Sequence, residues 1–172
     1  MNHPLYLIAA ADSRNGIGIH GRLPWSLKGD LQFFQEITER TEDLMRKNMI
    51  IMGWVTWESL PAGKRPLPGR HNVVLNLDSR YTAPGATVFT SLETALQSAD
   101  KTIEKIFVIG GGRTYREAIL HPDVTGVYLT RVQGDFNCDT FFPPIPKRFN
   151  HIQRLGAKHE KNIAYEFLLY TA

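Results

Sequence analysis

Apolar residues follow two spacings along this chain, and each spacing predicts a different element. Uninterrupted apolar runs of about four to eight residues predict buried strands, and apolar residues recurring every three or four positions predict helices. The runs predict strands over 5–11, 47–53, 72–77, 86–89, 105–109, 124–132, 150–155 and 163–170. The helical spacing predicts helices over 27–40, 54–60, 92–99 and 113–120, with Ser26 and Ser91 as candidate N-caps of the first and third.

Strands and helices alternate through most of the chain, and strands dominate its end. This order predicts an α/β layered fold whose central eight-stranded sheet is mostly parallel, with about four flanking helices and an antiparallel edge at the C-terminal end. The length of 172 residues suits one full hydrophobic core, and the chain contains no repeat or linker-like tract. We therefore expect residues 1–172 to form a single domain.

The helix predicted over 27–40 carries a carboxylate on its apolar side. At about 100° per residue, Asp30 falls on the stripe formed by Leu27, Leu31, Phe34 and Ile37. A poorly hydrated carboxylate is costly unless something pairs with it. Two interpretations stay open: either the helix turns Asp30 toward water, or Asp30 faces a pocket and binds a ligand there.

Two junctions between a predicted strand and a predicted helix contain residues suited to phosphate binding. Glycines at 110–112 would let a phosphate approach backbone N–H groups, although a tight turn uses the same residues. Thr56, three residues after Gly53, would hydrogen-bond a phosphate or cap the following helix. Neither junction has the dinucleotide fingerprint or a Walker A motif. Together they favour an extended ligand with two phosphates, lying across the carboxyl ends of the strands.

A rigid loop, Pro66-Leu67-Pro68-Gly69, precedes Arg70. A guanidinium held in this way suits a bidentate contact with a carboxylate, although a single arginine is more often a solvated surface residue.

Composition narrows the class of ligand. The net charge of +3 comes from scattered basic residues, which argues against a nucleic-acid partner and favours an anionic small molecule. The one cysteine excludes an internal disulfide and a cysteine zinc site, and it favours the cytoplasm as the location. The six histidines have no metal-ligand spacing, so no metal is expected. No apolar run approaches about 18 residues, so no membrane span is expected.

Taken together, these motifs resemble the dihydrofolate reductase family, from Leu7 to Tyr170 and in the family's order. The matching segments are Ile8-Ala9-Ala10, Gly18, Leu23-Pro24-Trp25, Asp30-Leu31 with Phe34, Thr56-Trp57-Glu58-Ser59, Pro66-Leu67-Pro68-Gly69-Arg70, Ile109-Gly110-Gly111-Gly112 with Tyr115, and Tyr128-Leu129-Thr130. The resemblance implies a three-layer fold and the reduction of 7,8-dihydrofolate to tetrahydrofolate. In that reaction NADPH donates a hydride to pterin C6 and N5 gains a proton, which supplies one-carbon metabolism and nucleotide synthesis.

The resemblance also implies a substrate site around Asp30, whose two oxygens would bind the 2-amino group and the ring N–H of the pterin. Arg70 would bind the substrate's α-carboxylate. The implied catalytic residues are Asp30, Trp25, Leu23 and Thr130. The implied substrate-binding residues are Ile8, Ala9, Asp30, Leu31, Phe34, Leu60, Leu67, Arg70, Ile109 and Thr130.

The implied cofactor is NADPH, with a cis peptide between Gly110 and Gly111 and a loop from Ser13 to Leu23 that closes over the nicotinamide. The implied cofactor-binding residues are Ala10, Ile17, Gly18, Leu23, Gly53, Trp54, Val55, Thr56, Leu75, Asn76, Leu77, Ile109, Gly111, Gly112, Arg113, Thr114 and Tyr115. The sequence departs from the family at Trp54, where an Arg or Lys usually binds the 2′-phosphate. It also departs at Asn76 and Leu77, where hydroxyl residues are common. We therefore predict a narrower preference for NADPH over NADH than is typical.

The expected partners are dihydrofolate and antifolates such as trimethoprim or methotrexate, and the expected state is a monomer. Two alternatives stay open. One is the related reductase of riboflavin synthesis, against which Asp30, Phe34 and Arg70 argue, because its substrate has no glutamate tail. The other is a folate- or nucleotide-binding module without turnover.

Overall fold

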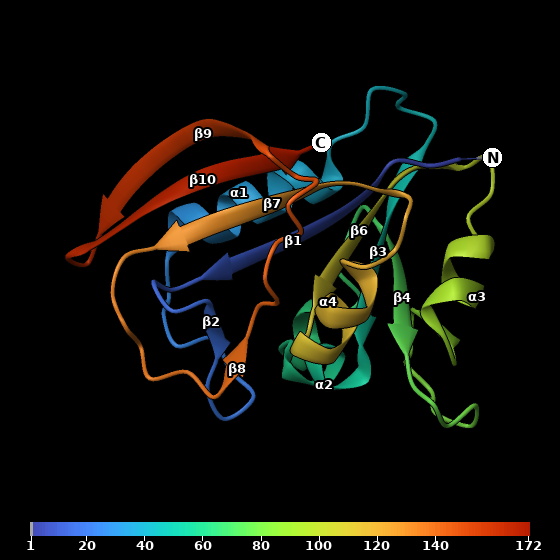
Figure 1. Cartoon of the computed structure of the whole chain (residues 1–172). Coiled ribbons are helices and arrows are strands. Elements are labelled where there is room, and N and C mark those ends of the chain that lie inside the picture. Colours follow the sequence, from blue (N-terminus) through green and yellow to red (C-terminus); the bar gives the residue numbers. More distant parts are fainter. Residues whose placement is uncertain (1) are drawn as a thin grey trace.

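The computed structural model describes residues 2–172, which form a twisted sheet with helices packed on its two faces (Figure 1). The strands are β1 (Leu5–Ala11), β2 (Gly16–Gly18), β3 (Lys47–Gly53), β4 (His71–Leu75), β5 (Thr87–Phe89), β6 (Ile103–Gly110), β7 (Val124–Val132), β8 (Thr140–Phe141), β9 (His151–Glu160) and β10 (Ile163–Thr171). The helices are α1 (Lys28–Glu39), α2 (Trp54–Ser59), α3 (Leu92–Gln97) and α4 (Gly112–Ala118), with a 3₁₀ turn at Ala62–Lys64.

The main sheet confirms the predicted topology. Within residues 2–172 it has eight strands in the order β5-β4-β3-β6-β1-β7-β10-β9. Neighbours from β5 to β7 pair in parallel, whereas β10 pairs antiparallel with both β7 and β9. The C-terminal hairpin β9–β10 therefore forms the antiparallel edge, drawn in red in Figure 1.

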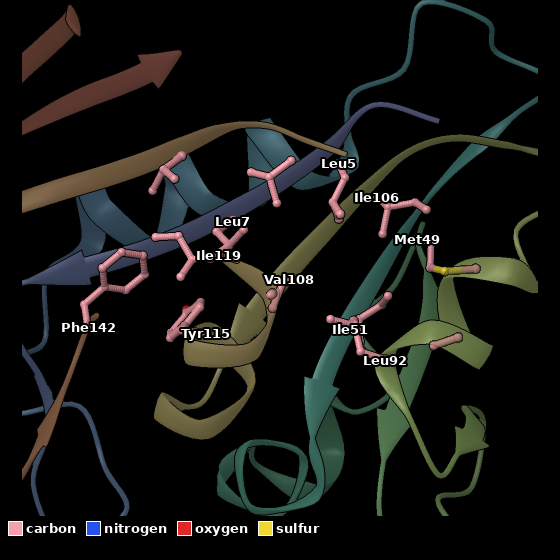
Figure 2. Packing of buried hydrophobic residues seen from close by; sticks show 14 of the residues in the cluster. Leu5, Leu7, Met49, Ile51, Leu92, Ile106, Val108, Tyr115, Ile119 and Phe142 are labelled. Carbon is pink, nitrogen blue, oxygen red and sulfur yellow. The ribbon is translucent and has the colours of Figure 1, made fainter. Parts of the chain in front are cut away.

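Alternating side chains of the central strands divide the core into two apolar layers, as the period of two in a strand requires. In β3, Met49 and Ile51 pack with α3 and α4, whereas Ile50 and Met52 pack with Trp57 of α2 and, on the same face, Phe34 of α1. Figure 2 shows the first layer, where Leu92, Tyr115 and Ile119 cover the strands. Helices on both faces of one sheet confirm the three layers.

The structure differs from the sequence prediction in three elements. The stretch 13–23, expected as a loop, contains β2, which pairs antiparallel with β8 in a small second sheet. Strand β9 extends five residues beyond the predicted end at 155 and reaches Glu160. Helix α1 begins after Leu27, and Ser26 does not cap it, so that predicted N-cap is wrong. No helix within residues 2–172 is long and apolar enough to span a membrane.

Candidate active site

One cavity of about 1590 Å³ lies across the carboxyl ends of the parallel strands, bounded by α1, α2 and the loop that precedes α1. Its lining includes every residue predicted to bind substrate or cofactor. It also includes three of the four predicted catalytic residues, Leu23, Asp30 and Thr130. Segments far apart in the sequence thus meet in one space, at the edge of a parallel sheet where ligands usually bind.

Asp30 faces this cavity from the first turn of α1 with only 9% of its surface exposed. Burial raises the pKa of its carboxyl, a hydrogen bond from the Thr130 hydroxyl opposes the rise, and the negative charge of Glu160 adds to it. No Lys, Arg or His in the described chain forms an ion pair with Asp30. Asp30 thus faces a pocket and not bulk water, and its binding of a ligand there stays a prediction. The apolar stripe is less uniform than predicted, because Leu31 lines the cavity while 52% exposed.

The glycine junction after β6 brings backbone close to two hydroxyl groups. The Gly110–Gly111 peptide is cis, as expected. A Cβ added to Gly110 or to Gly111 would lie 3.2 Å from Oγ1 of Thr56, and one added to Gly53 would lie 3.1 Å from Oγ1 of Thr114. Both junctions therefore expose bare backbone beside a hydroxyl, which suits contact with phosphate oxygens.

Hydrogen bonds fix two side chains of the cavity, Tyr115 beside the Gly110–Gly111 peptide and Arg70 at the far end. The Tyr115 hydroxyl donates to the carbonyl of Ile8 over 2.7 Å, and burial holds its pKa far above the usual range. The Arg70 guanidinium, 8% exposed, donates through Nη1 to Thr38 Oγ1 over 3.0 Å and through Nε to the Pro68 carbonyl over 2.9 Å. Arg70 is thus held by α1 and by its own loop, with further guanidinium donors left for a carboxylate.

The end of the cavity beyond β4 has little positive charge. Trp54 lies with its ring centroid 6.3 Å from that of Tyr81. Asp78 lines the cavity, and its Oδ1 accepts from Nε of Arg80 over 3.0 Å. Because the Arg80 guanidinium pairs with the Asp78 carboxylate, the positive charge of Arg80 is partly neutralised.

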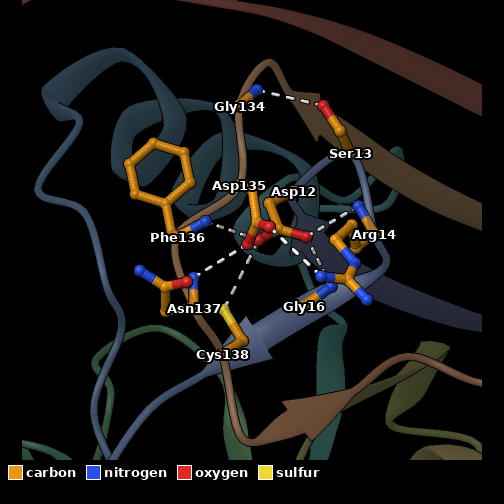
Figure 3. A network of polar contacts seen from close by, with 9 residues as sticks. All are labelled: Asp12, Ser13, Arg14, Gly16, Gly134, Asp135, Phe136, Asn137 and Cys138. Atoms are coloured by element: carbon orange, nitrogen blue, oxygen red, sulfur yellow. Dashed lines mark hydrogen bonds and ion pairs between the residues drawn. The ribbon is translucent and has the colours of Figure 1, made fainter.

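A buried carboxylate organises the loop that borders the cavity (Figure 3). Asp12, 1% exposed, accepts through Oδ1 from the backbone N–H groups of Arg14 and Gly16 and through Oδ2 from that of Phe136, over 2.8–3.0 Å. The Cys138 thiol also donates to Oδ2 over 3.7 Å. Asp12 therefore ties the start of the 13–23 loop to the segment that follows β7.

We expect Asp12→Asn to lower the free energy of unfolding by about 2 kcal/mol at pH 7. The NH₂ group of asparagine would take the place of one carboxylate oxygen and would face a backbone N–H donor without an acceptor between them. Burial raises the pKa of Asp12, but the hydrogen bonds from Phe136, Gly16 and Arg14 outweigh it and the pKa is lowered. A lowered pKa gives stability above the unfolded pKa of about 3.9, and this stability is lost as the pH falls through the folded value.

Urea unfolding at pH 7 and at about pH 3 measures this difference. The loss should be full at pH 7 and smaller at the lower pH. An Asp12→Asn protein as stable as the unmodified one at pH 7 would show that the network contributes nothing to stability.

Trp25, which the resemblance implies as a catalytic residue, does not border the cavity in the described structure. It is buried in the cluster that contains Tyr165 and Phe167, and its ring meets Phe136 edge to face at 5.1 Å. Trp25 is buried because its ring packs against Phe136, after β7, and in the same cluster as Tyr165 and Phe167 of β10. Its indole N–H is buried without a hydrogen-bond partner among residues 2–172.

Several lining residues were not predicted. Phe33 lines the cavity and stacks on Phe167 with ring centroids 4.0 Å apart. The helical stripe pointed only to Phe34, which also lines the cavity. Thr140 arrives through the β2–β8 pairing, for which no local pattern exists. Ser91 and Asp78 follow β5 and β4, and their positions after strands were the available signal. Residues 2–172 contain no cluster of His, Cys, Asp and Glu that would hold a metal.

Comparison with known proteins agrees with this geometry. A family model described as dihydrofolate reductase matches residues 4–172. Dihydrofolate reductase of Heliothis virescens is 42% identical, covering 96% of each chain. That of Drosophila melanogaster is 37% identical, covering 94% of this chain and 93% of its own. A bifunctional dihydrofolate reductase-thymidylate synthase of Zea mays is 44% identical over 81% of this chain.

The chain spans about a third of the length of the bifunctional plant relatives it matches. The two insect relatives, in contrast, are matched over 96% and 93% of their length. Since the family model covers nearly all of residues 2–172 and the sheet, the cis glycine peptide and the cavity agree with it, the chain belongs to the dihydrofolate reductase family.

Proposed function

We propose that this protein reduces 7,8-dihydrofolate to 5,6,7,8-tetrahydrofolate with NADPH. The observation that carries the proposal is the Asp30 carboxyl, which is buried, faces a large apolar cavity and forms no ion pair within the described chain. A buried carboxylate of this kind is costly unless a ligand satisfies it. Two adjacent N–H donors on the flat edge of a pterin match its two oxygens.

The apolar residues around Asp30 fit the rest of this substrate. Leu31 and Phe34 of α1 and Leu60 and Leu67 across the cavity would pack on the pterin and the aminobenzoyl ring. Arg70 lies at the same end of the cavity and would bind the α-carboxylate of the glutamate tail, because its fork matches a carboxylate. This arrangement favours a folate over the pyrimidine substrate of the related reductase, which has no such tail.

The residues present fit a nicotinamide dinucleotide. The exposed backbone at the two glycine junctions, with Thr56 and Thr114 beside it, would bind the diphosphate. Ala10, Ile17 and Gly18 would surround the nicotinamide. When bound, the cofactor supplies a hydride to pterin C6. The protein's own contribution is orientation and the exclusion of water by the 13–23 loop. Asp30 anchors the pterin edge away from N5, so solvent delivers the N5 proton.

The test is a spectrophotometric assay at 340 nm with NADPH and dihydrofolate. We expect dihydrofolate-dependent oxidation of NADPH that methotrexate inhibits. Methotrexate binding without turnover would instead support a binding module, and turnover of a pyrimidine substrate alone would support the related reductase.

A further prediction concerns the adenosine end of the cavity, where Trp54, Asn76 and Leu77 supply no positive charge and Asp78 supplies a negative one. We expect NADPH to be preferred over NADH by less than about a thousandfold in kcat/KM, a ratio that corresponds to roughly 4 kcal/mol. Dissociation constants of both cofactors, measured by quenching of tryptophan fluorescence, check the same ratio without turnover. A preference above a thousandfold in both measurements would contradict the prediction.

A further inference from the structure

The tip of the β9–β10 hairpin contacts the first turn of α1. The carboxylate of Glu160, the last residue of β9, accepts from the backbone N–H of Lys28 through Oε1 and from that of Gly29 through Oε2, the latter over 3.2 Å. Oε2 also accepts from the Tyr165 hydroxyl over 2.8 Å. On the other side of the tip, Lys161 Nζ donates to the Ser26 carbonyl over 3.0 Å. The contact therefore joins two segments about 130 residues apart.

Helix α1 depends on this contact for its N-terminal hydrogen bonds. The first N–H groups of any helix lack partners within the helix, and a side chain at the N-cap usually supplies one. The N-cap here is Leu27, which has no such side chain, and Glu160 takes its place. Gly29 permits the approach, because an added Cβ would lie 2.3 Å from Oη of Tyr165 and 2.8 Å from Cδ of Lys158.

The same hairpin also adjoins the partner of Asp30. Asp30 directly follows Gly29, and the Thr130 side chain of β7 lowers the pKa of its carboxyl. In the sheet, Thr130 pairs with Phe167 of β10, two residues beyond Tyr165. The hairpin therefore contacts both elements that hold the Asp30 carboxyl: the start of α1 through Glu160, and β7 through its strand pairing.

We infer that Glu160, held by Tyr165, is a positioning residue for the proposed reaction: it fixes the first turn of α1 so that Asp30 faces the cavity opposite Thr130, and its negative charge acts on the Asp30 carboxyl. The inference rests on the proposed role of Asp30 in binding the pterin. Glu160 itself does not line the cavity, so it acts through Asp30.

The charges around Asp30 set the direction of the effect. Burial is the main cause of its raised pKa, the Thr130 hydrogen bond lowers the pKa, and Glu160 raises it further. Burial is the main cause of the raised pKa values of two phenols, Tyr115 of α4 and Tyr165 of β10, and the charge of Asp30 adds to both.

Three lysines surround the contact with Glu160. They are Lys28 of α1, Lys158 of β9 and Lys161 at the hairpin tip. Both phenols keep their protons near neutral pH, because their pKa values are raised. Removing the charge of Glu160 should therefore lower the pKa of Asp30.

Glu160→Gln and Glu160→Ala separate the two effects. Glutamine keeps an acceptor for α1 but removes the charge, so we expect the pKa of Asp30 to fall. This is read from the carboxyl infrared band of the free protein and from the pH dependence of kcat/KM. Alanine removes the acceptor as well, so we expect the KM for dihydrofolate to rise by about tenfold, with a smaller change in kcat. Glu166→Gln, which breaks the Arg154–Glu166 pair on the same hairpin, is the control and should change neither quantity.

The inference is overturned if Glu160→Gln leaves the titration of Asp30 unchanged in the free protein. It is also overturned if Glu160→Ala, folded by circular dichroism, keeps the KM of the unmodified protein. The infrared titration requires no turnover, so it judges the effect of Glu160 even if the unmodified protein fails to reduce dihydrofolate, a result that would contradict the proposed function alone.

Discussion

Asp30→Asn is expected to lower kcat/KM for dihydrofolate at pH 7 by a hundredfold to a thousandfold, which corresponds to roughly 3–4 kcal/mol of lost transition-state stabilisation. The carboxylate offers two acceptor oxygens to two pterin donors, whereas asparagine offers one acceptor and opposes the other donor with an N–H group. Asp30 is only 9% exposed, and its low exposure to water strengthens the lost interaction. Steady-state kinetics with dihydrofolate and NADPH measure the change.

The thermal stability of the folded protein is the control for this variant. A raised carboxyl pKa means that the ionised form of Asp30 is disfavoured in the folded state, so its stability contribution is present below the unfolded pKa of about 3.9 and is lost as the pH rises through the folded value. At pH 7, Asp30→Asn should therefore melt at a temperature no lower than that of the unmodified protein. Full activity of this variant at pH 7 would contradict the proposed anchor.

Arg70→Gln is expected to raise the KM for dihydrofolate by ten- to a hundredfold while changing kcat much less. The glutamate tail lies far from the reacting atoms, so its binding energy is made equally in the ground state and the transition state. Arg70→Lys should recover part of this loss, because the charge remains but the bidentate geometry does not.

The matched control uses the substrate instead of the protein. A dihydropterin that lacks the aminobenzoylglutamate tail should have the same KM with Arg70→Gln as with the unmodified protein. Because Arg70 also bonds to Thr38 and Pro68, an equal loss with both substrates would mean that the residue acts through the structure of α1 and its loop.

Signals that arise within a few residues of one another were sufficient to predict most of this molecule. The apolar runs located every strand of the main sheet, and the serine before α3 does cap it, with Ser91 Oγ accepting from the Thr94 N–H over 3.1 Å. Ser26 looked equivalent but does not cap α1, because the hairpin tip supplies Glu160 from the far end of the chain. A contact across about 130 residues leaves no periodicity to detect.

The position of Trp25 has the same origin. Leu23, two residues earlier, lines the cavity, but the side chain of Trp25 packs on Phe136 and near β10, residues that only the folded sheet brings close. The β2–β8 pairing, which delivers Thr140 to the cavity, likewise depends on Asp12 binding backbone of both segments. Local patterns therefore predicted which elements exist, and long-range contacts decided how the side chains at their ends point.

A crystal structure of the complex with NADPH and a folate or antifolate tests the central claim most directly. The account predicts that both carboxylate oxygens of Asp30 lie within about 3 Å of the 2-amino and ring nitrogens of the bound heterocycle, with the glutamate carboxylate of a folate on Arg70. A heterocycle bound away from Asp30, or an Asp30 carboxylate that pairs with a protein cation in the complex, would contradict it.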